Sequence, residues 1–518
     1  MKEHAERIAT GTAATALLAV LAWRFLRMHF GIDFTDESFY AASALRFANG
    51  ALPLVDEINL GALCEWLVAP VLHISGGDAG GSVLLLRWTH LFFSIGVGGV
   101  VMFALWPHCK PGESILFGTL PIAFVPFSVP MPSCNTLGVG LFTCGSVLVF
   151  RLQQRPDRRF AMAAGFSHAL ATLARPELVV GTAATAFTLM LRGTEQDQRK
   201  LALPYLCGAL SVGIVLAAYL GVIGPNRLAE SFAYMSSLGS AELSASKFLS
   251  SLRVCLNLLL QPQESASSLA WVFWASFITF PVFIFLRRSL EARRVLLSVA
   301  IPSIVGGFAV AAGSTNGFIN MPIGWFPSLL VVLALFMPKS RPLRILPFGA
   351  VLVFILILSV AQAAVYRDEQ LSKLDSIVSH GAWAGIRTTR GRLQFIEDVR
   401  HDIQTAAKRT GARTFLAYDR FPAGYLLSDL QPTTNTVWLF EIARFPKLDR
   451  TALLQYLDRQ HDWPDLVLRM KRIPEGGDRF FTLSYPPSDD FNRRIESAEY
   501  VPVINRQNYT LYARRQLF

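Results

Sequence analysis

Apolar stretches long enough to cross a lipid bilayer recur along most of this chain, and they restrict its fold more than any other feature. A membrane-spanning helix needs about 20 consecutive, mainly apolar residues. Of the 518 residues, 52% are apolar and only 16% are charged, whereas about a quarter are charged in a typical soluble protein. The apolar pattern predicts eleven spans, near residues 8–26, 82–105, 114–130, 133–150, 160–174, 177–191, 201–224, 268–286, 295–313, 318–337 and 344–364.

The distribution of basic residues orients these spans. If the N-terminus is cytoplasmic, the inner segments hold seventeen Lys and Arg residues and the outer loops hold six, which is the bias of the positive-inside rule. An odd number of spans then places the C-terminus outside. We therefore interpret the net charge of +11 as a result of topology and of attraction to an anionic inner leaflet, and we expect no nucleic acid partner.

The first outer loop, residues 27–81, carries an acidic pair, Asp36 and Glu37, soon after the first span. Residues that flank a span are usually Lys or Arg, whose long side chains reach the membrane surface. An acidic pair followed by Tyr40 is therefore more typical of a catalytic or binding site than of a membrane anchor.

Residues 36–48 of this loop have the apolar spacing of a helix, and Gly50 and Pro53 follow as stop signals. The acidic pair would then occupy the first turn of a helix that lies along the membrane surface. Because acids in a first turn are also stabilised by the helix dipole, a purely structural role for the pair stays open.

Two arginines near the outer side of the membrane are candidates for binding a lipid phosphate. Arg87 lies in the outer half of the second span, close to His90, and Arg175 lies between two short spans in the segment 174–177. An arginine within a membrane is costly and marks a functional hypothesis, and a guanidinium group binds phosphate well. Alternatively, Arg175 reaches toward the membrane surface or pairs with Glu177, and Arg87 is structural.

A third polar group consists of Asn316, Asn320 and Trp325, which cluster where another span begins. This group could bind sugar hydroxyls, or it could belong to the aromatic belt at the membrane surface. The sequence has no phosphate-binding glycine loop, no dinucleotide motif and no His/Cys metal spacing, which argues against ATP-driven transport. Cys64 and Cys134 could both lie outside, so one disulfide stays open.

The last 150 or so residues differ from the rest because charged residues become frequent and no run of membrane length remains. We predict helices at 392–409 and 449–460 and strands at 414–418, 466–470 and 509–514. The predicted fold is an α-helical polytopic membrane domain with about 11 spans, residues 1–365, followed by a soluble α/β domain, residues 366–518. Residues 225–267 are expected to form a long mobile or interfacial loop.

Several short motifs together resemble one family. The acidic pair and the surface helix are followed by Gly-x-x-Pro at 50–53, and Ala-Arg-Pro-Glu occupies 174–177. The tail carries Gly-Ala-Arg-Thr at 411–414, Pro-Ala-Gly-Tyr-Leu-Leu at 422–427 and Tyr-Thr-Leu-Tyr-Ala-Arg at 509–514. This arrangement resembles the GT-C superfamily of membrane glycosyltransferases, and more closely the bacterial branch related to protein O-mannosyltransferases and lipid A aminoarabinose transferases.

The resemblance implies an inverting glycosyltransferase of the bacterial inner membrane, with a cytoplasmic N-terminus and an extracytoplasmic tail. The enzyme would move a sugar from a polyprenyl-phosphate donor to a hydroxyl of a lipid, glycan or protein acceptor at the outer face. Asp36 would accept the proton of the acceptor hydroxyl, and Arg175 and Arg87 would hold the phosphate. The other readings are a polytopic transporter and a non-catalytic scaffold of envelope glycan assembly.

One departure from the family concerns the second functional acid. The usual Lys/Pro-Pro-Leu stretch is replaced here by residues 59–63, which leaves open whether Asp56, Glu57 or Glu65 is that acid. This acid or Glu37 would orient the acceptor. A divalent cation could bridge the carboxylates and the phosphate, but the sequence requires no cofactor.

Overall fold

The computed structural model describes residues 2–518 with the exception of 60, 78, 154, 192–195, 239–244, 262–263, 287–289, 315, 338–340, 440–450, 461–462, 477–478 and 487–488. The chain forms two compact units. Unit 1 comprises residues 1–27, 88–219 and 241–364, and unit 2 comprises residues 28–87, 220–240 and 365–518. The sequence predicts a division into 1–365 and 366–518; in the structure the first outer loop belongs to the same unit as the tail.

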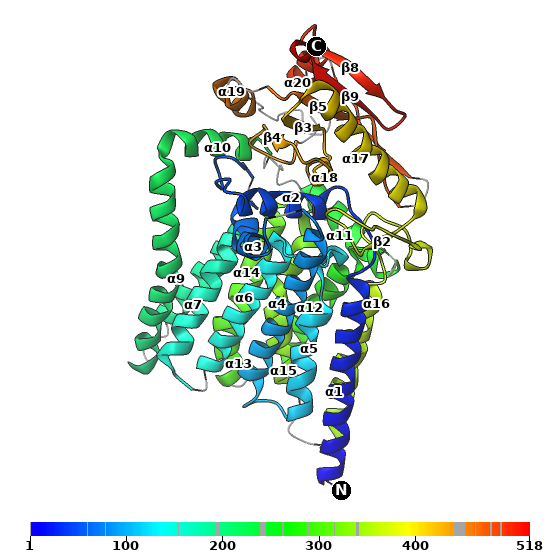
Figure 1. Ribbon diagram of the computed structural model, residues 1–518. Helices are drawn as coiled ribbons and strands as arrows, with labels where there is room; N and C mark the ends of the chain where they lie inside the picture. Colours follow the sequence, from blue (N-terminus) through cyan, green and yellow to red (C-terminus); the bar gives the residue numbers. More distant parts are fainter. Residues whose placement is uncertain are drawn as a thin grey trace. The chain divides into compact units, whose positions relative to one another are not determined.

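Unit 1 is a bundle of helices that run side by side (Figure 1). Helix α1 packs on α5, α6 packs on α7, and α14 packs on α8 and α15. Large apolar side chains, among them Phe117, Phe142 and Phe326, are fully buried in its core. The helices are α1 (Lys2–Arg27), α5 (Pro111–Ala123), α6 (Cys134–Leu152), α7 (Arg158–Ala174), α8 (Val179–Leu191), α11 (Ala245–Leu259), α12 (Ser267–Leu286), α13 (Leu290–Val295), α14 (Ile301–Gly313), α15 (Pro322–Phe336) and α16 (Arg341–Ala361).

Two further helices, α4 (Ser82–Leu105) and α9 (Gln196–Ile223), begin or end in unit 2 and run through unit 1. Short helical turns connect some of the long helices. They are η1 (Pro126–Ser128), η2 (Pro176–Leu178), the π-helical turn η3 (Leu296–Ala300) and η4 (Gly317–Asn320).

Five helices in the part of the chain that the structure describes are long and apolar enough to cross a membrane. They are Glu3–Arg27, Ser82–Leu105, Cys134–Leu152, Lys200–Ile223 and Arg293–Gly313. The other predicted spans also fall on helices, but these helices are shorter or carry more polar residues in their described parts. For example, α5 ends at Ala123, and Phe124 and Val125 are extended before η1 begins at Pro126. Proline disfavours a helical conformation of the residue directly before it, here Val125. The multi-pass α-helical architecture is therefore seen, and the count of eleven spans stays a prediction.

The stretch 225–267 differs from the prediction of a loop. It contains two helices, α10 (Pro225–Leu238) in unit 2 and α11 (Ala245–Leu259) in unit 1. Both are rich in serine and too short to span a membrane, which is why no apolar run marks them in the sequence.

Unit 2 is built around a five-stranded mixed sheet in the order β4-β3-β5-β9-β8. Strand β3 is parallel to β4 and β5, and β9 is antiparallel to β5 and β8. Two small hairpin-like pairs, β1 with β2 and β6 with β7, lie outside this sheet. The strands are β1 (Ser376–Ile377), β2 (Arg387–Thr388), β3 (Thr414–Tyr418), β4 (Gln431–Pro432), β5 (Leu466–Met470), β6 (Arg472–Pro474), β7 (Phe480–Thr482), β8 (Tyr500–Asn505) and β9 (Tyr509–Arg514).

Helix α17 packs on β8 and β9 of this sheet, and α18 packs on α2. The helices of unit 2 besides α10 are α2 (Asp36–Ala48), α3 (Ala62–Ile74), α17 (Arg390–Thr410), α18 (Ala423–Leu427), α19 (Thr451–Gln460), α20 (Asp490–Ile495) and the 3-10 turns η5 (Leu371–Lys373) and η6 (Arg515–Leu517). The C-terminal α/β prediction is confirmed at α17, β3, β5 and β9. The first residues of the predicted helix 449–460 lie outside the described residues.

Within unit 2, the first outer loop and the tail form one hydrophobic and polar core. Phe34, which is almost fully buried, has ring contacts with Trp383, Phe395 and Phe421 of the tail. The backbone N–H of Ile32 donates to Asp368 Oδ2 at 2.8 Å. The start of α2 is therefore fixed by residues that follow it by more than 330 positions in the sequence.

Candidate active site

The acidic pair begins helix α2, as the sequence predicts. Asp33 accepts hydrogen bonds from backbone N–H groups at this helix start. The two carboxylate oxygens of Asp33 accept the backbone N–H groups of Thr35 and Glu37 at 3.0 and 2.8 Å. These N–H groups would otherwise be unsatisfied at a helix N-terminus. Burial raises the pKa of Asp33 to about 6, against the opposing effect of the Arg367 guanidinium, and the Asp36 carboxylate adds to the rise.

Asp36 is the accessible member of the acidic pair, since about 31% of its side chain is exposed. Its Oδ2 accepts a hydrogen bond from the hydroxyl of Tyr366 and lies 3.1 Å from Nη1 of Arg367. Among the residues that the structure describes, its Oδ1 has no hydrogen-bond donor. One oxygen is therefore held and the other can accept a proton.

Tyr366 and Arg367 were not identified from the sequence. They lie at the start of the tail, 330 residues or more after the acids that they contact, and nothing around them in the sequence marks a site. Burial alone would lower the pKa of Arg367, but the carboxylates of Asp36 and Asp33 raise it. Arg367 also has a φ of 51°, a left-handed conformation that is unfavourable for a non-glycine residue and is often found at functional sites.

Glu37 points away from this accessible group and forms a buried ion pair with Arg87. Its two oxygens lie 2.7 Å from Nε and Nη2 of Arg87. The same guanidinium donates to the carbonyls of Met28 and Gly31 at 2.5 and 2.6 Å, and both side chains are about 97% buried. The contacts of Glu37 and Arg87 thus hold the backbone of the loop before α2 in place. The roles of Glu37 in acceptor binding and of Arg87 in phosphate binding stay predictions.

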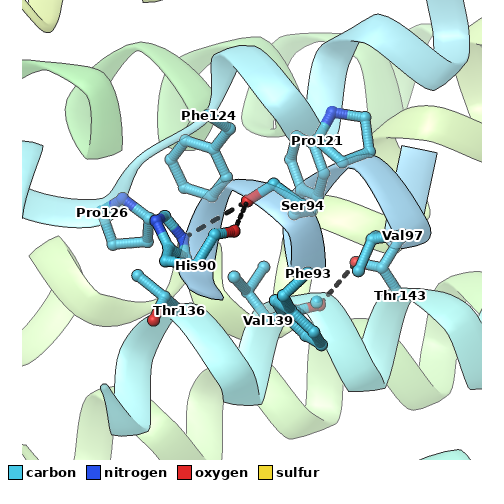
Figure 2. A pocket seen from close by; sticks show the side chains of 12 residues that line it. His90, Phe93, Ser94, Val97, Pro121, Phe124, Pro126, Thr136, Val139 and Thr143 are labelled. Atoms are coloured by element: carbon cyan, nitrogen blue, oxygen red, sulfur yellow. Dashed lines mark hydrogen bonds between the residues drawn. The ribbon is translucent and has the colours of Figure 1, made fainter. Parts of the chain in front are cut away.

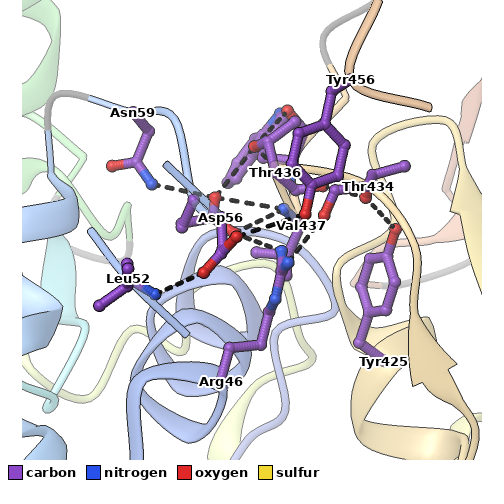
Figure 3. A network of polar contacts seen from close by, with 11 residues as sticks. Arg46, Leu52, Asp56, Asn59, Tyr425, Thr434, Thr436, Val437 and Tyr456 are labelled. Carbon is purple, nitrogen blue, oxygen red and sulfur yellow. Dashed lines mark hydrogen bonds and ion pairs between the residues drawn. The ribbon is translucent and has the colours of Figure 1, made fainter. Parts of the chain in front are cut away.

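Glu57 is the centre of a second buried network in unit 2; its partners Arg46, Asn59, Thr436 and Val437 are labelled in Figure 3. Arg46 contacts its Oε2 at 2.8 Å, and Asn59, the hydroxyl of Thr436 and the backbone N–H of Val437 donate to it at 3.0 to 3.2 Å. Its side chain is fully buried. Burial raises the pKa of Glu57, and Arg46 opposes this rise. Both carboxylate oxygens of Glu57 thus form hydrogen bonds or ion pairs within the protein.

The other predicted residues of the first loop have different surroundings. Asp56 accepts the backbone N–H of Leu52 at 2.7 Å and the hydroxyl of Tyr456 at 3.3 Å, which closes the loop (Figure 3). The ring of Tyr40 packs on that of Phe39 with centroids 5.1 Å apart.

Glu65 is the third acid that the sequence left open as the second functional acid. It is fully buried, and neither carboxylate oxygen has a hydrogen-bond partner in the described part of the chain. Burial raises the pKa of Glu65 well above its usual value, and the nearby Glu57 adds to the rise. Burial without a partner thus favours the protonated form of Glu65 over its carboxylate.

Arg175, Glu177 and Asn316 belong to unit 1. Arg175 is 6% exposed; its Nη1 donates to Asn135, its Nη2 lies 3.7 Å from Glu177, and its Nε has no partner among the described residues. Asn316 is exposed and directly precedes η4, whereas Trp325 is buried and donates to the carbonyl of Ile304 at 3.1 Å. Trp325 thus packs within the bundle, and the phosphate-binding role of Arg175 stays a prediction.

His90, which neighbours Arg87 in the sequence, lines a small pocket in unit 1 together with Ser94 and Thr136 (Figure 2). Arg24 Nη2 lies 3.0 Å from its Nδ1, and Ser94 Oγ lies 3.4 Å from its Nε2. The pocket has a volume of about 20 Å³, which is room for about one water molecule. A sugar does not fit, so this group is a buried polar contact between helices.

Metal binding was left open by the sequence. Among the described residues, no three His, Cys, Asp or Glu side chains are grouped as a metal ion would require. No disulfide links the described cysteines.

A scan against protein-family models and a search of curated proteins found no match. Among solved structures, ArnT from Cupriavidus metallidurans bound to undecaprenyl phosphate is similar, with a TM-score of 0.56 and 12% identity over 97% of this chain and 98% of that chain. Oligosaccharyltransferase from Archaeoglobus fulgidus in its apo form has a TM-score of 0.49 and 10% identity over 88% of this chain and 69% of that chain. This chain has the GT-C fold, in agreement with the resemblance of its motifs.

Proposed function

We propose that this protein is a membrane glycosyltransferase that takes a sugar from a polyprenyl-phosphate donor and transfers it, with inversion, to an acceptor hydroxyl at the outer face of the membrane. The observation that supports this most is the Asp36 carboxylate, which is accessible, held at Oδ2 and open at Oδ1. A general base needs this combination of a fixed orientation and a free acceptor oxygen. Fold alone does not determine function, but ArnT has this fold and was solved with a polyprenyl phosphate bound.

The proposed reaction is a single displacement. The acceptor oxygen attacks the anomeric carbon and forms the new glycosidic bond while the bond from that carbon to the phosphate oxygen breaks. The electron pair of the broken bond leaves with polyprenyl phosphate, and the hydroxyl proton moves to Asp36 Oδ1. Attack from the side opposite the leaving group inverts the anomeric configuration.

The acceptor class remains to be assigned among lipids, glycans and proteins. The test uses the purified full-length protein, undecaprenyl-phosphate sugars with a radiolabelled sugar, and membrane extract of a strain that lacks the gene. We expect labelled product and released undecaprenyl phosphate with the wild-type protein and neither with Asp36→Asn. Equal turnover by a folded Asp36→Asn protein would refute the mechanism. A parallel assay with a chelator tests whether a divalent cation takes part.

The outer-face assignment has its own test. A phosphatase fused after Phe518 is expected to be active, and a cysteine in place of Ser428 is expected to react with a membrane-impermeant thiol reagent in spheroplasts. Labelling only after membrane disruption would place the tail in the cytoplasm and would favour a soluble nucleotide-sugar donor.

A further inference from the structure

The guanidinium of Arg367 has one occupied edge and one open edge. Nη1 donates to the hydroxyl of Thr35 and contacts Asp36 Oδ2 at 3.1 Å. Nε and Nη2, on the other edge, donate no hydrogen bond to any residue in the described part of the chain. The nearest carboxylate on this side is Glu475, whose Oε1 is 4.0 Å from Nε, which is too long for a hydrogen bond.

The open edge of Arg367 is accessible. About 23% of the Arg367 side chain and 31% of the Glu475 side chain are exposed, whereas Arg87 is 2% exposed and uses all three guanidinium nitrogens. The Nε and Nη2 donors of an arginine are parallel and match two oxygens of a phosphate group. Among the described residues, Arg87 and Arg367 contact the acidic pair, and of these two Arg367 has a free edge for an anion.

We propose that Arg367 binds the phosphate of the lipid donor through Nε and Nη2, and that Glu475 occupies the neighbourhood of this edge until the phosphate replaces it. The proposal rests on the proposed function, since it names the residue that holds the leaving group. Arg367 would be a binding residue in direct contact with substrate, and Glu475 a competing carboxylate.

This arrangement places the base and the leaving group on two edges of one cation. During transfer Asp36 changes from a carboxylate to a neutral acid as it takes the proton. The phosphate changes from a diester with one negative charge to a monoester with up to two. The total charge around Arg367 is therefore unchanged. One negative charge moves from the Asp36 edge to the phosphate edge of the same preorganised cation, so the cation need not rearrange during transfer.

The first test measures the affinity of the purified full-length protein for undecaprenyl phosphate in detergent micelles. We expect Arg367→Gln to weaken binding by about tenfold or more, since a charge-assisted contact is lost. Arg367→Lys, which keeps the charge but not the planar edge, should lie between this variant and the wild type. Glu475→Gln should strengthen binding by about two- to fivefold, because an exposed competing ion pair is removed.

The opposite signs of the two variants separate binding from a structural role. A merely structural ion pair would give the same direction of change for Arg367→Gln and Glu475→Gln. The matched controls are Arg494→Gln and Glu499→Gln, which remove another exposed ion pair of unit 2, 3.2 Å long, and should leave the affinity unchanged. Unfolding temperatures of all variants exclude loss of folding as the cause.

Competition with inorganic phosphate tests whether the site binds free phosphate or the phosphate of a lipid. We expect it to displace undecaprenyl phosphate weakly from the wild-type protein and not measurably from Arg367→Gln. Unchanged affinity of Arg367→Gln, or weaker binding by Glu475→Gln, would overturn the assignment.

The transfer assay then separates this proposal from the proposed function. A rise in the donor KM for Arg367→Gln, with the acceptor KM unchanged, supports both. Normal transfer by Arg367→Gln overturns the role of Arg367 while the glycosyltransferase function stands. If the variants bind as expected but the wild-type protein transfers no sugar, Arg367 still belongs to a lipid-phosphate site. The proposed glycosyltransferase function is then refuted.

Discussion

Asp36 and Glu37 are adjacent in the sequence, and each carboxylate is paired with an arginine, yet the two pairs differ in almost every physical respect. The Glu37–Arg87 pair is nearly inaccessible, with both carboxylate oxygens at 2.7 Å from the guanidinium. The Asp36–Arg367 pair is partly exposed and has one contact of 3.1 Å. Adjacent residues at a helix start point in different directions, so one acid fixes the loop and the other is left open to solvent.

The difference lies in burial and in the number of partners, which decide whether an ion pair can exchange one of its contacts. A buried pair with all its donors used cannot bind substrate without losing several contacts, and leaving one charge unpaired there is strongly unfavourable. A partly exposed pair contributes little to stability and can exchange partners.

The largest expected effect is on catalysis by Asp36. Asp36→Asn removes the base in a nearly isosteric way and should reduce the turnover number at least about 100-fold, while the unfolding free energy should change by no more than about 1 kcal/mol. Radiolabelled sugar transfer and thermal unfolding of the same preparation measure both quantities. A large loss of stability would show that the Asp36 pair is structural as well.

Glu37→Gln is expected to have the reverse profile. Losing the charge of Glu37 leaves Arg87 buried without its counter-ion, which should lower the unfolding free energy by about 3–5 kcal/mol. Thermal unfolding in detergent, with Asp36→Asn as the control, gives the comparison. If Glu37→Gln is as stable as the wild type and only the KM for the acceptor rises, Glu37 orients the acceptor as the sequence suggests.

A third arginine, Arg175 in unit 1, combines features of both pairs. It is buried, but one guanidinium nitrogen has no partner among the described residues and its contact with Glu177 is 3.7 Å long. Arg175→Ala should weaken donor binding by about 1.5–3 kcal/mol and leave acceptor binding unchanged. Steady-state kinetics with each substrate varied separately would show this. A change in the acceptor KM alone would remove Arg175 from the donor site.

The smallest expected effect concerns the pH dependence set by Asp33. Its pKa is about 6 in the folded protein, above the usual 3.8, so the folded state binds the proton more tightly than the unfolded state between these values. Stability should therefore fall as pH rises from about 4 to about 6. Unfolding temperatures measured across this range should fall less for Asp33→Asn than for the wild type, and parallel curves would contradict the shift.

Some elements could be predicted from the sequence because their signals are local. Helix α2 has the predicted bounds, 36–48, since acids mark its start and Gly50 follows its end. Strand β3 likewise has the predicted bounds, 414–418, because it is a short apolar run after a glycine. The GT-C fold was also indicated by short motifs and is shown by the structural similarity to ArnT.

The partners of the acids could not be predicted because they depend on contacts between distant segments. Tyr366 and Arg367 have no sequence feature that distinguishes them from other residues at the end of a span. The different surroundings of Asp56, Glu57 and Glu65 arise in part from tail residues such as Thr436 and Tyr456, so spacing along the first loop could not separate them. The role of Asp36 as base was predicted from its position and stays a prediction.

The order in which the chain is synthesised has a consequence for the two ion pairs. Glu37 and Arg87 are 50 residues apart, so their pair can form early in synthesis. Tyr366 follows Asp36 by 330 residues, and at about 5–20 residues per second the ribosome delivers it roughly 15 to 70 s later. A nascent chain therefore acquires the Glu37–Arg87 pair first and the partners of Asp36 last, and a truncated product lacks the groups that hold Asp36.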